Sequence, residues 1–407
     1  MYSMRARHKQ RKSRFKARFT RFLLFMAIGG LAFNYLRPLP HADASVASLN
    51  DTAQTVKLAW PSQGSAAIGA EGFGMLETHG SQAQRPTASI AKLITTLAVL
   101  EKHPLQVGEQ GPTLTLTQQD ADLFNHYYAI GGSYVKVEVG EKITEYQALE
   151  AVLLPSANNM ADSLAIWTFG SLDNYHTYAR NMLKRFDMND TVVGADASGM
   201  SPATKSTPAD LLKLGELALQ NKVVAQIVQE PSAVIPVHGV ITSVNARLAS
   251  KDNVIGIKTG LTDEAGGCFV FAATNKTSEG KSVTVVGAIM GMPNLPSALA
   301  ASDPLVASAE KYFSVKTPVK AGEIFATLTT PWLTSAKVVA KEDITLVSWN
   351  GMALSPRIEL SSVNRSLPVG AQVGTAIVAS GTNTATTPLV LQEAISGPSW
   401  QWRIKRF

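Results

Sequence analysis

Lys258-Thr259-Gly260, continuing into Leu261-Thr262-Asp263-Glu264-Ala265-Gly266-Gly267-Cys268, is the stretch of sequence that decides the fold. It holds the only Lys-Thr-Gly of the 407 residues. Two other short motifs precede it in the chain, Ser89-Ile90-Ala91-Lys92 and Ser156-Ala157-Asn158. Motifs of these three kinds, in this order, are known to meet in one active site. The pattern therefore predicts an enzyme that forms an acyl intermediate on a serine.

The first two motifs are weak signals when taken alone. Ser-x-x-Lys and Ser-x-Asn strings each occur five times in the chain, so order and context must select one of each. Ser89 leads into an apolar run, residues 93–100, which has helix length and contains neither Gly nor Pro. Residues three apart share one helix face, so we expect Lys92 to lie within hydrogen-bond reach of Ser89. A serine hydroxyl needs such a base, and burial or a second cation, here Lys258, lowers the pKa of a lysine toward that role.

These motifs and their flanks resemble the serine D-alanyl-D-alanine carboxypeptidases, the low-molecular-weight penicillin-binding proteins. Leu153–Asp162 resembles the second motif of that family with its flanks, and Ser206–Asp210 resembles a neighbouring block. The resemblance runs from about Leu58 to Val390. It implies a mixed α/β catalytic domain of the β-lactamase/transpeptidase type, followed by a small C-terminal all-β domain. Two departures stand out: Asn159 occupies a position where many members carry Asp, and no arginine lies in Met292–Phe313.

The resemblance also implies roles for the motif residues. Ser89 is expected to be the nucleophile and Lys92 its base, while Ser156 relays a proton and Asn158 holds the substrate amide. The expected substrate-binding residues come from the third motif: Lys258, Thr259, Gly260 and Leu261. The backbone N–H groups of Ser89 and Leu261 are expected to stabilise the oxyanion. The implied activity removes the terminal D-alanine from peptidoglycan stem pentapeptides, with β-lactam antibiotics as covalent inhibitors. No cofactor and no metal are expected.

Three other functions remain open at the level of sequence. A DD-endopeptidase acting on cross-linked peptides would use the same chemistry. A membrane-tethered, non-catalytic wall-binding protein could keep the same fold, because a fold does not guarantee an activity. A β-lactamase would need a dedicated carboxylate to activate the deacylating water, and Ser156-Ala157-Asn158 lacks the Asp of the lactamase version of this motif.

The N-terminal charge pattern predicts export from the cytoplasm. The first 21 residues hold nine Lys or Arg and no acid, which leaves 28 basic against 31 acidic residues in the remainder. An uncharged run of 15 residues follows at Phe22–Leu36. The pattern is typical of a signal peptide or membrane anchor and not of a nucleic-acid-binding tail. Cleavage at Ala42-Asp43-Ala44 and retention of the anchor are both open, and either places the bulk of the chain outside the cytoplasm, membrane-associated or secreted to the cell wall.

Composition changes along the chain divide it into segments. We expect a basic cytoplasmic segment (1–21), a signal peptide or anchor (22–36), a flexible linker (37–57), a catalytic domain (58–314), a β-domain (315–399) and an aromatic, basic tail (400–407). The tail reads equally well as an interfacial anchor or as a terminal edge strand. Periodicity predicts strands at 66–76, 268–274 and 283–289, and helices at 90–102, 145–153, 159–169, 172–186 and 208–220. Cys268, the only cysteine, is expected to be a buried strand residue.

Overall fold

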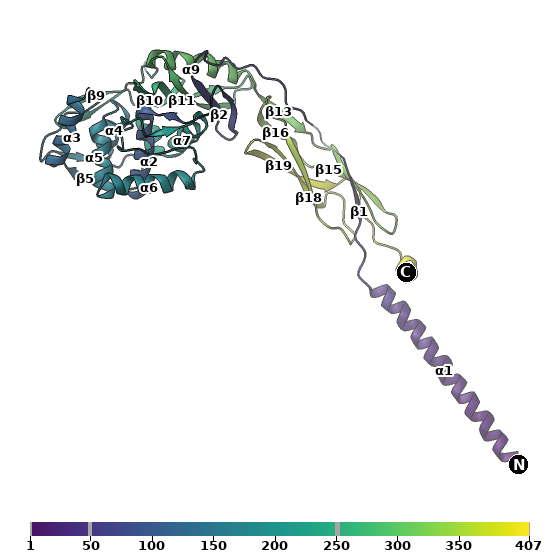
Figure 1. Ribbon diagram of the computed structural model, residues 1–407. Coiled ribbons are helices and arrows are strands. Elements are labelled where there is room, and N and C mark those ends of the chain that lie inside the picture. The colour runs from purple at the N-terminus through teal and green to yellow at the C-terminus, as the bar shows by residue number, and fades with distance from the viewer. Residues whose placement is uncertain (1, 48–50, 249–252, 407) are drawn as a thin grey trace.

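The computed structural model describes residues 2–47, 51–248 and 253–406, with side chains from residue 14 onward. Parts of the predicted segments therefore lie outside the described residues: Met1, residues 48–50 of the linker, residues 249–252 and Phe407. The chain forms an elongated molecule (Figure 1). A long N-terminal helix stands at one end, a β-region follows, and a mixed helix and sheet region lies at the other end. This order agrees with the expected fold class.

The N-terminal helix α1 spans Tyr2–Leu36. Its part from Arg14 to Leu36, 23 residues, is long and apolar enough to cross a membrane. The large apolar side chains of this part are exposed in the structure, among them Phe22, Phe25 and Leu36. Nothing in the described chain covers them, which is the exposure pattern of a signal sequence or of a membrane-spanning helix.

A five-stranded antiparallel sheet forms the centre of the catalytic region, in the order β10-β11-β12-β2-β3. The strands are β2 (Ser65–Ala70), β3 (Gly74–His79), β10 (Val254–Thr262), β11 (Gly266–Lys276) and β12 (Ser282–Met292). Side chains of β11 alternate between two faces, because successive strand residues point to opposite sides. Val270 and Ala272 join one core with the helices before β10, while Phe269 and Phe271 join a second core under α9 (Leu295–Glu310).

Helices cover the first of these two faces. They are α2 (Ala91–Lys102), α3 (Gln118–Ala129), α4 (Glu145–Leu153), α5 (Asn158–Phe169), α6 (Leu172–Arg185), α7 (Pro208–Gln220) and α8 (Lys222–Ile227). The predicted helices at 145–153 and 208–220 have the observed bounds, and the other three agree within one residue. The strand predicted at 66–76 is wrong as a single element, because a turn at Gly72, with φ near +79°, divides it into β2 and β3.

The C-terminal region is a separate β-structure with its own core. Its strands are β13 (Phe313–Val319), β14 (Ile324–Thr329), β15 (Ser335–Ala340), β16 (Ile344–Trp349), β17 (Ser355–Leu360), β18 (Gln372–Ser380) and β19 (Asn383–Leu391). Five of them form a sheet in the order β14-β15-β19-β18-β17, and β13 pairs with β16. Like the small all-β domain that was expected, it contains none of the three motifs.

The structure corrects two interpretations of the segments flanking this region. The linker predicted to be flexible contains the strand β1 (Asp43–Val46), which pairs with β14 as the sixth strand of the sheet. Of the two alternatives for the tail, the edge strand is wrong, because Trp400–Lys405 forms a short helix, α10, whose start is capped by Ser399. The segments on either side of the β-region thus have defined contacts, β1 with β14 and α10 with α1.

Candidate active site

Ser89 lies in a short 3₁₀ turn, Ala88–Ile90, that leads directly into α2. Ala88 has a φ of +48°, in the left-handed region that a residue with a side chain rarely adopts. The surrounding loop holds it there: a side chain at Gly199 would place its Cβ 2.0 Å from the Ala88 carbonyl oxygen. Backbone strain of this kind is concentrated at functional sites. The turn places Ser89 just before the first residues of α2, Ala91 and Lys92.

Lys92, one turn into α2, brings the first two motifs together. Its Nζ donates to Ser89 Oγ at 2.8 Å, to Asn158 Oδ1 at 2.6 Å and to the Ser198 carbonyl at 2.9 Å. These three contacts use all three donors of an ammonium group. A neutral Lys92 would have a lone pair, and the adjacent Ser89 hydroxyl could then donate its proton to Nζ.

Burial lowers the pKa of Lys92 to about 7, while the negative charges of Asp196 and Asp162 act in the opposite direction. The side chain is fully buried, so the charged form loses its hydration. Near neutral pH, a substantial fraction of Lys92 is therefore unprotonated. A base with a pKa near the working pH is well suited to general base catalysis.

The second lysine, Lys258, sits against the second serine. Its Nζ donates to Ser156 Oγ at 2.9 Å and to the Thr259 carbonyl at 3.2 Å. Ser156 lies in the loop between α4 and α5 with a φ of +66°. Burial, and then the charge of Lys92, lower the pKa of Lys258 well below its usual range. The sequence analysis named burial and the charge of Lys258 as causes of a lowered pKa in Lys92; burial is the first cause for Lys92, and the charge effect is seen on Lys258, from Lys92.

The third motif brings β10 against the nucleophile. A Cβ at Gly260 would lie 3.0 Å from the Thr87 carbonyl and 3.2 Å from the Ser89 nitrogen, so a side chain there would crowd the turn. Thr259 is buried beside Gly260, and Leu261 is 53% exposed at the end of the strand. The structure thus places all eight predicted residues at one site. Direct hydrogen bonds join Ser89, Lys92 and Asn158 in one group and Ser156 and Lys258 in another.

Asn159, the first departure from the family pattern, clamps a neighbouring loop. Its side chain accepts from the Val135 N–H at 3.1 Å and donates to the Val135 carbonyl at 3.0 Å. The neighbouring Asn158 N–H donates to the Ser133 carbonyl in the same loop. An aspartate could not donate to Val135. The amide therefore fits this chain because it offers a donor and an acceptor at once.

Two carboxylates near Lys92, those of Asp196 and Asp162, were not identified from the sequence. Asp196 accepts backbone N–H groups of Ser198 and the residues after it. This fixes the Ser198 carbonyl that contacts Lys92. Asp162 accepts from the Tyr127 hydroxyl at 2.6 Å and from the Ala197 N–H at 2.8 Å. The local sequence Asp196-Ala197-Ser198-Gly199 contains a turn signal of the Asx type, which could have identified this loop.

Arg85 is a third residue that sequence reasoning missed. It lies in β4 (Arg85–Pro86), and its guanidinium packs against Gly291, where a Cβ would meet Nη1 at 2.4 Å. No carboxylate lies within ion-pair distance of Arg85 in the part of the chain that the structure describes. The side chain is half-buried. Its positive charge acts on the thiol of Cys268, and Cys268 pairs with Gly260 between β11 and β10.

Cys268 is buried, as predicted for a strand residue. Burial raises the pKa of its thiol to about 11, while a backbone hydrogen bond and the positive charge of Arg85 act to lower it. The thiolate is the nucleophilic form of a cysteine. Cys268 is thus poorly suited to be a nucleophile.

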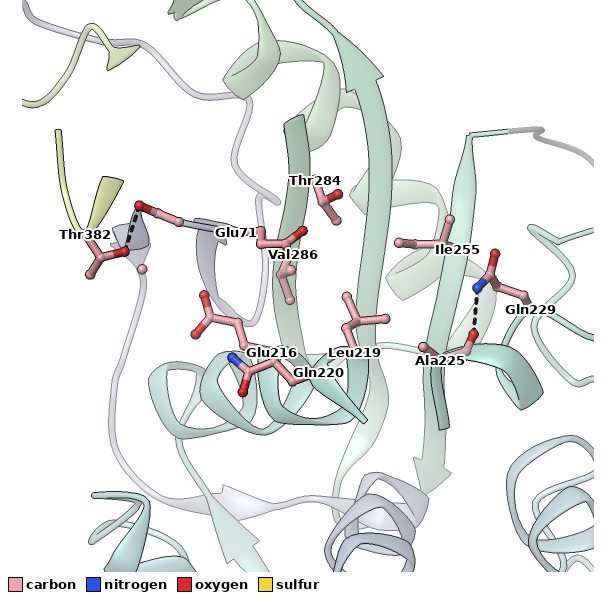
Figure 2. A pocket seen from close by; sticks show the side chains of 12 residues that line it. Glu71, Glu216, Leu219, Gln220, Ala225, Gln229, Ile255, Thr284, Val286 and Thr382 are labelled. Carbon is pink, nitrogen blue, oxygen red and sulfur yellow. Dashed lines mark hydrogen bonds between the residues drawn. The ribbon is translucent and has the colours of Figure 1, made fainter. Parts of the chain in front are cut away.

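A cavity of about 380 Å³ lies beside α7 and the start of β10, where Ile255 lines it (Figure 2). It is bounded by α7, α8, the β2–β3 turn and the β18–β19 turn, where Thr382 donates to the Gly72 carbonyl at 2.7 Å. None of the eight predicted residues lines it. The catalytic chemistry is therefore not assigned to this cavity.

Comparison with known proteins shows which proteins the chain resembles. A family model described as D-alanyl-D-alanine carboxypeptidase, peptidase family S11, matches residues 66–290, more than half of the chain. The chain is 27% identical over 238 residues to the D-alanyl-D-alanine carboxypeptidase of Streptomyces sp. strain K15, an alignment that covers 54% of this chain and 77% of that protein. It is 30% identical over 194 residues to D-alanyl-D-alanine carboxypeptidase DacB2 of Mycobacterium tuberculosis, covering 46% of this chain and 62% of that protein.

Solved structures extend the likeness to the C-terminal region. The peptidoglycan synthesis regulatory factor PBP3 of Streptococcus pneumoniae superposes with a TM-score of 0.60 at 21% identity, covering 83% of this chain and 100% of that one. At this identity the likeness concerns the fold. It confirms the expected fold class for the catalytic region and for the β-region together.

We predict that replacing Asn159 with Asp destabilises the site. The change removes the donor to Val135 and buries a carboxylate against a carbonyl, which costs about 1–3 kcal/mol for the lost partner alone. The expected result is a lower thermal unfolding midpoint and slower acylation by penicillin. Asn189→Asp, at an exposed position, is the matched control. Equal behaviour of the two variants would contradict the assigned clamp.

Proposed function

The chain belongs to the D-alanyl-D-alanine carboxypeptidase family of serine peptidases, and we propose that it removes the terminal D-alanine from peptidoglycan stem pentapeptides through an acyl-enzyme on Ser89. The observation that carries the proposal is the pair of buried lysines, each in contact with one serine hydroxyl: Lys92 with Ser89, and Lys258 with Ser156. A structural role alone does not account for two buried ammonium groups placed side by side.

Acylation begins with the neutral form of Lys92. Ser89 Oγ attacks the carbonyl carbon of the penultimate D-alanine, and the hydroxyl proton passes to Lys92 Nζ. The carbonyl oxygen takes the negative charge of the tetrahedral intermediate. The N–H groups of Ser89 and Leu261 would stabilise that charge, at about 3–4 kcal/mol for a well-placed donor. The close approach of Gly260 to the Ser89 nitrogen supports this arrangement.

Collapse of the intermediate needs a proton on the departing amine. Ser156 is the proposed donor: as its hydroxyl proton passes to the amine nitrogen, Ser156 takes a proton from the ammonium group of Lys258, which contacts its hydroxyl. The C–N bond breaks, free D-alanine leaves, and the ester on Ser89 remains. Asn158 orients Lys92 and offers its amide Nδ2 to the substrate. Water then hydrolyses the ester: the water oxygen adds to the acyl carbon, Ser89 Oγ leaves with the proton that Lys92 had accepted, and the proton released by the water restores Lys258. A β-lactam would acylate Ser89 in the same way.

The substrate carboxylate needs a cation and a hydroxyl at the far side of the scissile bond. Thr259 supplies the hydroxyl and Lys258 adds positive potential. Arg85 is the further cation that we assign to this function, because its half-buried guanidinium packs against Gly291, its charge acts on Cys268, the partner of Gly260, and it has no protein anion among the described residues. It would take the place of the arginine that the stretch 292–313 lacks.

The proposed placement is outside the cytoplasm. The basic residues that precede the apolar part of α1 favour a cytoplasmic N-terminus. The catalytic region would then face the cell wall, where peptidoglycan stem peptides occur. The endopeptidase reaction on cross-linked peptides shares every step above, and no contact in the described chain favours it over the carboxypeptidase reaction.

The function is tested by D-alanine release from a stem pentapeptide. We expect Ser89→Ala to abolish release, because no other hydroxyl contacts Lys92 among the described residues. Ser278→Ala is the matched control, since Ser278 begins another Ser-x-x-Lys string away from the site. Release that survives in Ser89→Ala would show that the nucleophile is wrongly assigned. An inactive wild-type protein that is correctly folded would favour a non-catalytic wall-binding role.

The assignment of Arg85 is tested with two substrates, a D-alanyl-D-alanine peptide and its C-terminal amide. A charge-assisted hydrogen bond contributes about 1.5–3 kcal/mol, so the KM of Arg85→Gln for the acid should rise about tenfold or more. Its KM for the amide should stay nearly unchanged. Arg180→Gln, at an exposed position, controls for loss of charge. If Arg85→Gln weakens both substrates equally, Arg85 has only a structural role.

A further inference from the structure

The last described residues of the chain pack against the C-terminal end of α1, the end nearest the β-region (Figure 1). The contacts join residues 34–38 to residues 402–406, and we refer to this group as the terminal clasp. The two partners are separated by more than 360 residues of sequence. The clasp does not depend on the catalytic site, which lies at the other end of the molecule.

The terminal clasp supplies hydrogen-bond donors to the end of α1. The last four carbonyl groups of any helix lack partners inside the helix. Here the Phe33 carbonyl accepts from the Arg37 N–H, the Asn34 carbonyl from Arg406, and the Tyr35 carbonyl from Arg403. Three of the four unpaired carbonyls of α1 are thus satisfied, two of them by residues of the tail.

Arg406 makes the most extensive contacts. Its Nε and Nη2 reach the Asn34 carbonyl at 3.0 and 2.8 Å, and Nη1 reaches the Pro38 carbonyl at 3.1 Å, with a further contact from Nη2 to the Arg37 carbonyl. A guanidinium at a helix C-terminus also interacts favourably with the helix dipole. In return, Asn34 Nδ2 donates to the Ile404 carbonyl at 3.3 Å. The tail therefore completes α1 through side chains of both partners.

Aromatic and basic side chains surround the clasp. The guanidinium of Arg403 lies over the Tyr35 ring at 5.5 Å, and that of Arg406 over the Trp402 ring at 5.5 Å. Trp402 contacts Trp332 edge to face, and Trp400 is 63% exposed. Neither residues 32–42 nor residues 394–407 contain an acid. Tryptophan, tyrosine and arginine are the residues that occupy the boundary between lipid headgroups and hydrocarbon.

The segment that follows α1 is also held in place. The Ala42 N–H donates to the Val363 carbonyl, and Asp43–Val46 pairs with β14 from Thr329 to Ala326. The possible cleavage site at Ala42-Asp43-Ala44 therefore lies at the start of a paired strand. Cleavage after Ala44 would separate α1 from the β-region and leave Arg403 and Arg406 without these acceptors.

We infer that α1 is retained in the mature protein as a membrane anchor and that the terminal clasp rests on an anionic lipid headgroup surface. The chain thereby fixes both ends of its β-region at the membrane, and the strand β1 ties the anchor to the sheet. The β-region then holds the catalytic region at a set distance from the bilayer. Lys405, Arg403 and Arg37 supply the positive charge that attracts the headgroups.

The test uses the full-length protein purified from membranes and reconstituted in nanodiscs with phosphatidylglycerol. Intact mass is expected to include α1. Hydrogen exchange of the 399–406 peptide is expected to be slow in the wild type and at least tenfold faster in Arg406→Ala. Lys341→Ala removes the same charge from an exposed residue outside the terminal clasp, and should stay close to the wild type. Penicillin acylation should be unchanged in both variants, because the catalytic site is remote.

Three results would overturn the inference. A mature chain that begins at Ser45 would show that the anchor is cleaved. Equal exchange of Arg406→Ala and wild type would show that the clasp does not form. The third result is hydrogen exchange of the 399–406 peptide that stays equally slow when phosphatidylglycerol is replaced with phosphatidylcholine. It would exclude anionic headgroups as the partner, because an electrostatic attraction to the lipid must weaken when the lipid loses its net charge. None of these results bears on D-alanine release, so the clasp and the proposed function fail separately.

Discussion

Two fully buried lysines, Lys92 and Lys258, impose the constraint on which the catalytic region depends. An ammonium group loses its hydration when it is buried, and the protein compensates with hydrogen bonds to Ser89, Asn158, Ser156 and backbone carbonyls. The remaining penalty appears as lowered pKa values in both side chains. The same burial that costs folding free energy gives Lys92 a pKa of about 7, which suits a general base. The negative charges of Asp196 and Asp162 act to raise that pKa.

The architecture serves to hold these two lysines at a fixed separation. Lys92 is carried by α2 and Lys258 by β10, and the loop before α5 brings Ser156 and Asn158 between them. The close contact of Gly260 with the turn at Ser89 sets the distance between helix and strand. Asn159 secures the same loop through Val135. The β-region, the strand β1 and α1 contribute none of the eight predicted residues, and in the arrangement that we infer their contacts set the position of the site relative to a membrane.

Sequence was informative wherever a local pattern determines a local structure. The helices at 145–153 and 208–220 have clear polar and apolar periodicity with start signals at Thr144 and Thr207, and their bounds agree with the structure. Two of the three motifs could be placed from local geometry, because Ser89 and Lys92 are one helix turn apart and Lys258 to Leu261 follow one another on a strand. The pairing of β1 with β14 was missed, since a short strand of Asp, Ala, Ser and Val has no distinctive pattern.

The residues missed at the site act through tertiary contacts. Arg85 precedes the Ser89 motif in the sequence, and only the fold brings its guanidinium against Gly291. Asp196 accepts the N–H groups of a turn and thereby positions the Ser198 carbonyl, which accepts from Lys92. Burial also determines the pKa of Lys92, and burial at a single position cannot be read from composition. The helix α3 was overlooked because its residues are mostly polar, although Thr117 and Asp120 form a capping box at its start.

The central claim is that a buried Lys92 of lowered pKa activates Ser89. The most direct measurement is the rate of penicillin acylation from pH 5.5 to 8.5, followed by intact mass with the adduct located by peptide mapping. Lys92 accepts a proton only when neutral, so the account predicts an adduct on Ser89 whose rate falls about tenfold per pH unit below about 7 and levels above it. An adduct at another residue, or a rate that is constant down to pH 5.5 or still rising at pH 8.5, would contradict the account.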